Sequence, residues 1–180
     1  MNKQNTMPPL KILQYPDKGL KRVSIPVVNF DESIQKVIDD MFETHYATPN
    51  CAALAATQLN LEIPWRITVI DYSANKDQPL CLVNPQIIHR EGEQNEYEGC
   101  MSVFPQHIHE KVKRAMKITV QYQDRYGTPH EIEAEGYFAK CIQHEVDHLD
   151  GHVFLDHLHK IKIDRILRKI KKVQRQGKNS

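Results

Sequence analysis

The sequence predicts an α+β fold in which mainly antiparallel sheets surround one central helix, with a basic amphipathic helix at the C-terminus. Short apolar runs bounded by turn residues precede a helical segment at residues 137–149, and strands followed by one central helix are typical of this class. Near the C-terminus an apolar stripe recurs at helical spacing, formed by Ile163, Ile166, Leu167 and Ile170.

The first helix is expected to begin at Asn29, because Asn29 can act as the N-cap and Glu32 follows three residues later. Apolar residues at helical spacing come next: Ile34, Val37, Ile38, Met41 and Phe42. Residues 48–50, with a central proline, should end this helix and open a loop.

Two short apolar runs, 67–70 and 81–83, are predicted strands. Residues 117–123 and 131–135 flank a turn at 124–127, a pattern that predicts a β-hairpin. The central helix should follow at 137–149, with Gly151 as its stop signal.

A chain of 180 residues fits a single domain, 1–180, in which 159–180 form the C-terminal helix and basic tail. Residues 1–10 are polar with two prolines, so no signal peptide is expected. No apolar run approaches the length of a membrane span. We therefore expect a cytoplasmic protein without a membrane partner.

The charge distribution is uneven. The segment from His159 to Ser180 carries a net charge of +8, which leaves −7 on the rest of the chain. A cationic tail on an acidic body favours a polyanionic partner such as RNA, although a solvated helix face would give the same pattern.

The segment from His144 to His148 has the pattern H-E-x-x-H within a predicted helix. Residues four apart lie on the same helical face, so His144 and His148 can hold one metal ion while Glu145 acts as a base. An amphipathic helix with surface histidines is the alternative interpretation. The pattern makes a metal-dependent hydrolase the first hypothesis.

A catalytic site of this kind needs a third protein ligand. Phe154 occupies the position where one peptidase class has its third histidine, and no glutamate follows Glu145. Four downstream residues remain candidates without matching either pattern: His152, His157, His159 and Asp164.

Cys100 is the better candidate, because a thiolate is a strong ligand for a borderline-soft ion. None of the four cysteines forms C-x-x-C, so in a reducing compartment each should be a packing residue or a ligand.

Three segments in this order resemble the signature motifs of peptide deformylases, G-x-G-x-A-A-x-Q, E-G-C-x-S and Q-H-E-x-D-H. The corresponding residues here are 51–58, 98–102 and 143–148. The similarity extends from about Leu10 to the last helix.

The resemblance implies a hydrolase that removes the formyl group from the N-terminal formylmethionine of new proteins. Its metal ligands would be Cys100, His144 and His148, binding Fe²⁺ or, as substitutes, Zn²⁺, Ni²⁺ or Co²⁺. Glu145 would transfer the proton, and the Gln58 side chain and the Met101 backbone N–H would meet the oxyanion. Asp147 is expected to pair with Arg114, and Glu98 to hold the motif loop or a histidine. In some family members the last helix docks on the ribosome, which fits the basic tail.

The chain also departs from the family pattern. Cys51 and Ala53 stand where glycine is usual. The residues expected to contact substrate are Ala52, Ala53, Leu54, Glu96, Gly99, Tyr137, Lys140 and Cys141. Because Glu96 and Lys140 stand at usually apolar positions, we expect them to pair with each other or to point to solvent, and we expect an altered preference for methionine. Two other functions stay open: a hydrolase for a different N-formyl or N-acyl substrate, and a weakly active RNA- or protein-binding module.

Overall fold

The computed structural model describes residues 8–177; the ends of the expected domain and tail, 1–7 and 178–180, lie outside the described residues. Within the described chain a five-stranded sheet has the order β1-β2-β3-β6-β7, and β4 pairs with β5 in a second sheet. The strands are β1 (Ala53–Ala55), β2 (Ile67–Ile70), β3 (Leu80–Glu91), β4 (Gln94–Glu98), β5 (Glu110–Arg114), β6 (Lys117–Gln123) and β7 (Pro129–Glu135). Every pairing between these strands is antiparallel, which confirms the predicted α+β class.

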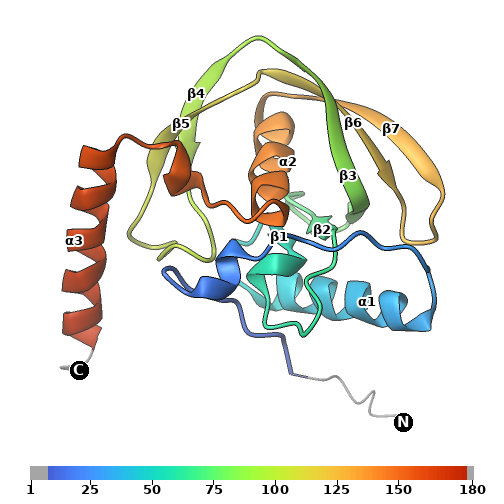
Figure 1. Ribbon diagram of the computed structural model, residues 1–180, viewed down its shortest axis with the longest axis horizontal. Helices are drawn as coiled ribbons and strands as arrows, with labels where there is room; N and C mark the ends of the chain where they lie inside the picture. Colours follow the sequence, from blue (N-terminus) through green and yellow to red (C-terminus); the bar gives the residue numbers. More distant parts are fainter. Residues whose placement is uncertain (1–7, 178–180) are drawn as a thin grey trace.

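Three α-helices complete the described fold: α1 (Glu32–Ala47), α2 (Gly136–Leu149) and α3 (Lys160–Gly177). Three short 3₁₀ turns also occur, η1 (Lys18–Lys21), η2 (Ala56–Gln58) and η3 (Phe154–His157). Figure 1 shows α2 at the centre beneath an arch formed by the two sheets, with α1 below and α3 apart at the left.

The expected N-cap of α1 is wrong by two residues. Asp31, not Asn29, caps the helix, because its carboxylate accepts hydrogen bonds from the backbone N–H groups of Ser33 and Ile34 at 3.0 and 3.2 Å. The helix ends at Ala47 with Thr48 as its C-cap, as residues 48–50 predicted.

The hairpin of β6 and β7 and the strand at 67–70 are confirmed. The run at 81–83 is only the start of β3, which continues to Glu91 with register shifts that let the strand bend. The short β1 and the polar pair β4 and β5 were not predicted. Burial in β4 does not alternate, since only its first and last residues are buried, so it lacks the usual period-two signal.

The central helix α2 buries most of its residues and ends where Gly151 takes a φ of +82°. A Cβ at this glycine would lie 2.8 Å from the carbonyl oxygen of Lys21. Glycine therefore allows both the left-handed turn and the close approach of two backbone segments. The chain then folds back through η3 toward the side of α2.

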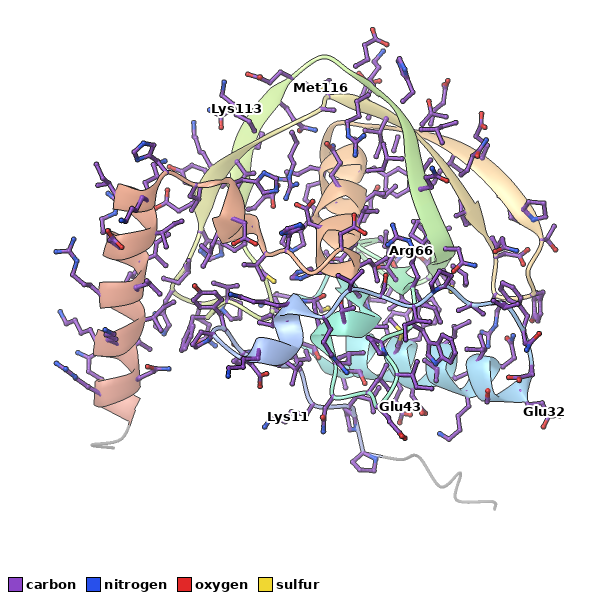
Figure 2. All side chains as sticks on the ribbon, viewed as in Figure 1. Lys11, Glu32, Glu43, Arg66, Lys113 and Met116 are labelled. Carbon is purple, nitrogen blue, oxygen red and sulfur yellow. The ribbon has the colours of Figure 1, made fainter. Side chains whose placement is uncertain are left out.

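Helix α3 packs against the loop that follows β4. Ile166 and Ile170 are buried in a cluster that includes Cys100 and Val103. Arg165 also forms an ion pair with Glu110 at 2.9 Å. Side chains on the outer side of α3 project away from the molecule, whereas those around α2 fill the space between the sheets (Figure 2). Within residues 8–177, no helix combines the length and apolar character needed to cross a bilayer.

Candidate metal centre

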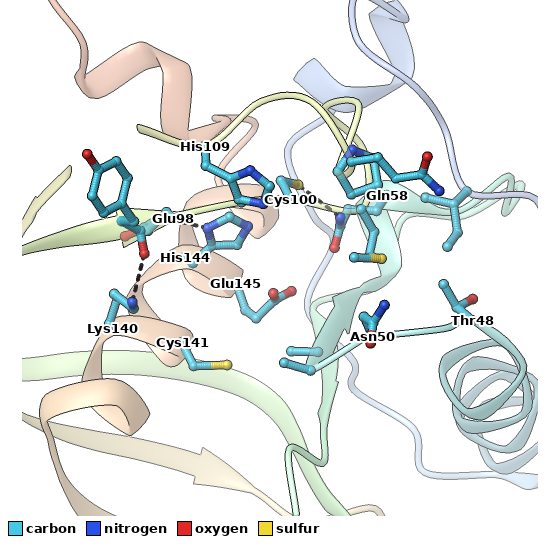
Figure 3. Close-up of a pocket in the computed structure, with 18 of the residues that line it drawn as sticks. Thr48, Asn50, Gln58, Glu98, Cys100, His109, Lys140, Cys141, His144 and Glu145 are labelled. Atoms are coloured by element: carbon cyan, nitrogen blue, oxygen red, sulfur yellow. Dashed lines mark hydrogen bonds and ion pairs between the residues drawn. The ribbon is translucent and has the colours of Figure 1, made fainter. Parts of the chain in front are cut away.

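The structure brings the three expected ligand atoms together. One turn of α2 separates His144 and His148, and their Nε2 atoms lie 3.2 Å apart. The sulfur of Cys100 lies 3.2 Å from Nε2 of His148. Among the described residues, these three are the group of histidine, cysteine or acidic side chains whose ligand atoms converge to within 4.8 Å. Figure 3 shows two of them, Cys100 and His144, at the wall of a pocket. His157, a candidate ligand from the sequence, lies outside this group.

The donor set fits one divalent ion of borderline softness. A thiolate with two imidazoles suits iron, zinc, nickel or cobalt in the divalent state, and three protein ligands leave one position for water or substrate. Burial holds the pKa of His148 well below its ordinary value, because a charged imidazole is disfavoured there. A neutral imidazole is the form that binds metal.

Cys100 is positioned by a tight turn directly after β4. The backbone N–H of Val103 donates to the Cys100 carbonyl at 2.9 Å, and the backbone N–H of Ser102 lies 3.4 Å from the sulfur. Gly99 packs against the ring of His109, where an added Cβ would lie 2.6 Å from the imidazole. Glycine before the ligand therefore lets His109 approach the backbone of this turn.

The polar groups behind the ligands also match expectation. Glu98 lies 2.8 Å from Nδ1 of His144, and Arg114 donates to both oxygens of Glu98 at 2.7 and 3.0 Å. Arg114 also contacts Asp147 at 2.5 Å. Burial alone would raise the pKa of Glu98, but the hydrogen bonds from His144 and Arg114 lower it to about 2. Glu98 is thus a fixed anion that orients one ligand.

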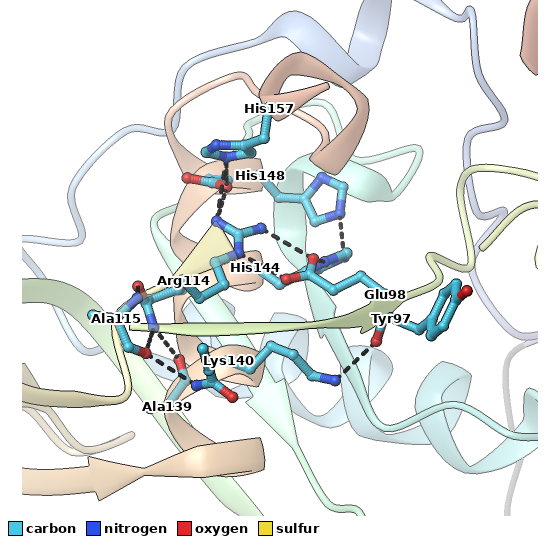
Figure 4. A network of polar contacts seen from close by, with 12 residues as sticks. Tyr97, Glu98, Arg114, Ala115, Ala139, Lys140, His144, His148 and His157 are labelled. Carbon is cyan, nitrogen blue, oxygen red and sulfur yellow. Dashed lines mark hydrogen bonds and ion pairs between the residues drawn. The ribbon is translucent and has the colours of Figure 1, made fainter. Parts of the chain in front are cut away.

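Sequence reasoning missed the part that His157 takes in this network. Its Nε2 lies 2.7 Å from Asp147 and 3.2 Å from Arg114 (Figure 4). The H-E-x-x-H pattern carries no signal for this contact, since His157 is brought there by the reversal of the chain at Gly151.

Glu145 is buried beside the ligands and lines the same cavity. The hydroxyl of Thr68 lies 3.5 Å from its carboxylate. Burial is the main reason that the pKa of Glu145 rises to about 7. A carboxylate with a pKa near neutrality can both accept and return a proton, which is what a general base must do.

The side-chain amide of Gln58, which belongs to η2, is held in place by hydrogen bonds. Its Oε1 accepts from the backbone N–H of Ala55 at 2.9 Å, and its Nε2 lies 3.0 Å from Ser102 Oγ and 3.5 Å from Cys100 Sγ. These contacts fix the amide so that its donor side faces the ligand loop. Met101 lines the cavity, and its carbonyl accepts from Gln14 at 2.7 Å.

A cavity of about 690 Å³ opens beside the ligand atoms. It is lined by six of the eight residues expected to contact substrate: Ala52, Ala53, Gly99, Tyr137, Lys140 and Cys141. Loops distant in sequence add residues that the motifs did not indicate, among them Gln14, Thr48, Asn50 and His109.

Two of the residues expected to contact substrate, Leu54 and Glu96, do not line this cavity. Leu54 is fully buried in the core against Leu59 and Ile67, so it does not face the cavity. Glu96 is exposed on β4, and Tyr97 lines the cavity in its place. Lys140 pairs with the carbonyl of Tyr97 at 2.9 Å, and no ion pair with Glu96 forms among the described residues. Glu96 therefore points to solvent, one of the two outcomes expected for it.

Comparison with known proteins decides the family. Residues 9–164 match the family model described as polypeptide deformylase. The chain belongs to this family. Peptide deformylase 1 of Coxiella burnetii is 61% identical over 168 residues, covering 93% of this chain and 98% of that protein. The peptide deformylase crystal structure from Legionella pneumophila is 40% identical with a TM-score of 0.87, covering 96% and 99%. That from Ehrlichia chaffeensis in complex with actinonin is 38% identical with a TM-score of 0.84, covering 94% and 99%.

Membership confirms the predicted class: a peptide deformylase, a metal-dependent hydrolase of protein biosynthesis. The two other functions, a hydrolase for another acyl substrate and a binding module, gain no support from these relatives.

Proposed function

We propose that this chain removes the formyl group from the N-terminal formylmethionine of newly made proteins, using one divalent ion held by Cys100, His144 and His148. The observation that carries the proposal is the convergence of these three ligands with the buried carboxylate of Glu145 at one cavity. Fe²⁺ is the proposed native ion, with Zn²⁺, Ni²⁺ or Co²⁺ as substitutes, since this donor set suits each of them.

A bound divalent ion supplies a nucleophile near neutral pH by lowering the pKa of a coordinated water. Glu145 would take up the proton released when the formyl carbon is attacked, and would return that proton to the nitrogen when the C–N bond breaks. The products are formate and a peptide with a free amine. The Gln58 amide and the Met101 backbone N–H stabilise the oxyanion.

The proposed substrate is an N-formyl peptide whose first side chain enters the cavity beside Tyr137, Lys140 and Cys141. Ala53, in place of the usual family glycine, adds a methyl group to the wall. Lys140 adds a cation that the family usually lacks there. These differences support a weaker preference for methionine than is typical of the family.

We also propose that α3 docks on ribosomal RNA and that the protein works in the cytoplasm, where nascent chains form. Arg168, Lys172 and Arg175 are exposed and share one face of α3, opposite the buried Ile166 and Ile170. Because those two isoleucines pack in the cluster containing Cys100, charge reversal on the outer face tests docking more cleanly than deletion of the helix.

The deciding experiment is turnover of formyl-Met-Ala by the protein loaded with Fe²⁺ under anaerobic conditions. We expect formate release by the wild type, and at least a 100-fold loss of kcat in Glu145→Ala with the metal content unchanged. Glu93→Ala, which removes an exposed glutamate outside the cavity, serves as the control. Absence of turnover in the fully loaded wild type would contradict the proposal.

A further inference from the structure

His157 occupies a junction between two charged side chains behind the metal centre. It ends η3, and its Nε2 lies 2.7 Å from Asp147 Oδ2 and 3.2 Å from Arg114 Nη1. Arg114 Nη1 lies 2.5 Å from the same Asp147 oxygen. Three polar atoms thus meet at one point (Figure 4).

The chemistry of the three groups fixes the direction of the hydrogen bonds. Guanidinium has only donors, and an ionised carboxylate has only acceptors. The shorter contact, to the carboxylate, therefore requires that His157 donate its Nε2–H to Asp147. Asp147 Oδ2 then accepts from both His157 and Arg114, and its orientation is held from two sides.

Asp147, fixed in this way, orients Arg114, and Arg114 in turn orients Glu98. Arg114 donates through Nη1 to Asp147 and through Nε and Nη2 to Glu98, so its planar fork is fixed by two anions. The second oxygen of Glu98 lies 2.8 Å from Nδ1 of His144. A continuous path of hydrogen bonds therefore joins His157 to a ligand of the metal.

The segment that carries His157 is itself well anchored. Phe154, at the start of η3, is buried and stacks on the ring of His144, with the ring planes 25° from parallel and the ring centroids 6.1 Å apart. The carboxylate of Asp156 accepts from the backbone N–H of Val153 at 3.0 Å. His157 is therefore presented to Asp147 by a rigid turn rather than by a free loop.

We propose that His157 is a positioning residue of the metal centre, which keeps His144 in its ligating orientation through Asp147, Arg114 and Glu98. The inference rests on the proposed function only in taking Cys100, His144 and His148 as the ligands. Partners that orient a ligand directly change metal affinity 10- to 100-fold when they are removed. Since His157 acts through three intervening side chains, we expect an effect near the lower end, about 10-fold.

The test measures zinc loss from the Zn²⁺-loaded full chain to excess chelator and needs no turnover. His157→Phe keeps a ring without an N–H donor, whereas His157→Gln keeps a donor without a ring. His152→Phe is the matched control, because His152 is exposed in the same segment and faces Asp156, not Asp147. The melting temperature of each metal-free variant reports any general loss of packing.

We expect His157→Phe to release zinc about 10-fold faster than the wild type. His157→Gln and His152→Phe should stay within about twofold of it, and the metal-free melting temperatures should agree closely. Release from His157→Phe at the wild-type rate would overturn the proposal. So would equally fast release from His157→Gln, because the ring and not the hydrogen bond would then matter. Failure of formyl-Met-Ala turnover would bear on the proposed function alone.

Discussion

The carboxylate of Glu98 lies 2.8 Å from Nδ1 of His144, so this imidazole presents its Nε2 to His148. Replacing Glu98 with glutamine keeps the shape but removes the charge that makes the imidazole a stronger ligand. We expect Glu98→Gln to lower zinc affinity about 10- to 100-fold, measured by competition with a chromogenic chelator. Glu96→Gln, an exposed change on the same strand, should have no effect. Equal affinities in the two variants would contradict this role of Glu98.

The same carboxylate should make stability depend on acid. The folded pKa of Glu98 is about 2, below its ordinary 4.5, so its contribution is complete above about pH 5. That contribution is lost as the pH falls toward 2. Urea unfolding of the metal-free protein between pH 6 and pH 2.5 should show the wild type losing roughly 3 kcal/mol more than Glu98→Gln. Parallel pH profiles for the two proteins would show that Glu98 is not the group responsible.

The ligands could be predicted from the sequence because their placement is local. The spacing of His144 and His148 is a property of any α-helix, and the motif around Cys100 marks the third ligand. The direction in which a side chain points on an irregular strand cannot be predicted from its neighbours in the sequence alone. For Glu96 the sequence left two directions open, toward Lys140 or toward solvent, because β4 shows no alternation and its partner β5 begins twelve residues after β4 ends.

The surroundings of Leu54 and His157 also differ from what the sequence predicted, and the physical reason is the same. Leu54 lies within a run of small residues that passes between core and cavity, and only the packing of β1 on β2 decides which residues face the core. His157 reaches Asp147 because the chain reverses at Gly151, so its partner depends on tertiary structure. The candidate metal ligands could therefore be predicted from the sequence more readily than the residues that orient them.

Gly151 should be sensitive to the smallest substitution. Alanine there must adopt a φ near +82° and place its Cβ about 2.8 Å from the Lys21 carbonyl oxygen. We expect Gly151→Ala to cost about 1–3 kcal/mol, which for a chain of this size lowers the melting temperature by about 2–4 °C for each kcal/mol. Gly177→Ala should be nearly neutral, since an added Cβ there meets no atom within 4 Å. Equal melting temperatures in calorimetry would show that the turn relaxes freely.

Charge reversal on the outer face of α3 should separate docking from catalysis. We expect the triple variant Arg168→Glu, Lys172→Glu, Arg175→Glu to lose most co-sedimentation with ribosomes at about 0.1 M salt, because phosphate contacts dominate such binding. Its kcat/KM on formyl-Met-Ala should stay within about twofold of the wild type.

The control for docking is a second triple variant with the same charge change elsewhere. Lys11→Glu, Lys18→Glu, Lys21→Glu alters exposed lysines of the N-terminal segment and should co-sediment like the wild type. If both triple variants lose ribosome co-sedimentation to the same extent, the net charge is responsible for binding and α3 is not the docking surface.

Lys140 should weaken the preference for methionine. Its ammonium donates to Tyr97 O and lies 5.1 Å from the Tyr137 ring, at the wall of the cavity. An apolar side chain that enters there must displace water from this cation, which reduces the gain from burying it. We expect Lys140→Leu to raise kcat/KM for formyl-Met-Ala about 3- to 10-fold and to leave formyl-Ala-Ala nearly unchanged. Lys111→Leu is the matched control, because Lys111 also contacts a tyrosine ring but does not line the cavity. A wild type that already strongly prefers methionine, with no gain in Lys140→Leu, would show that the ammonium lies outside the path of the substrate side chain.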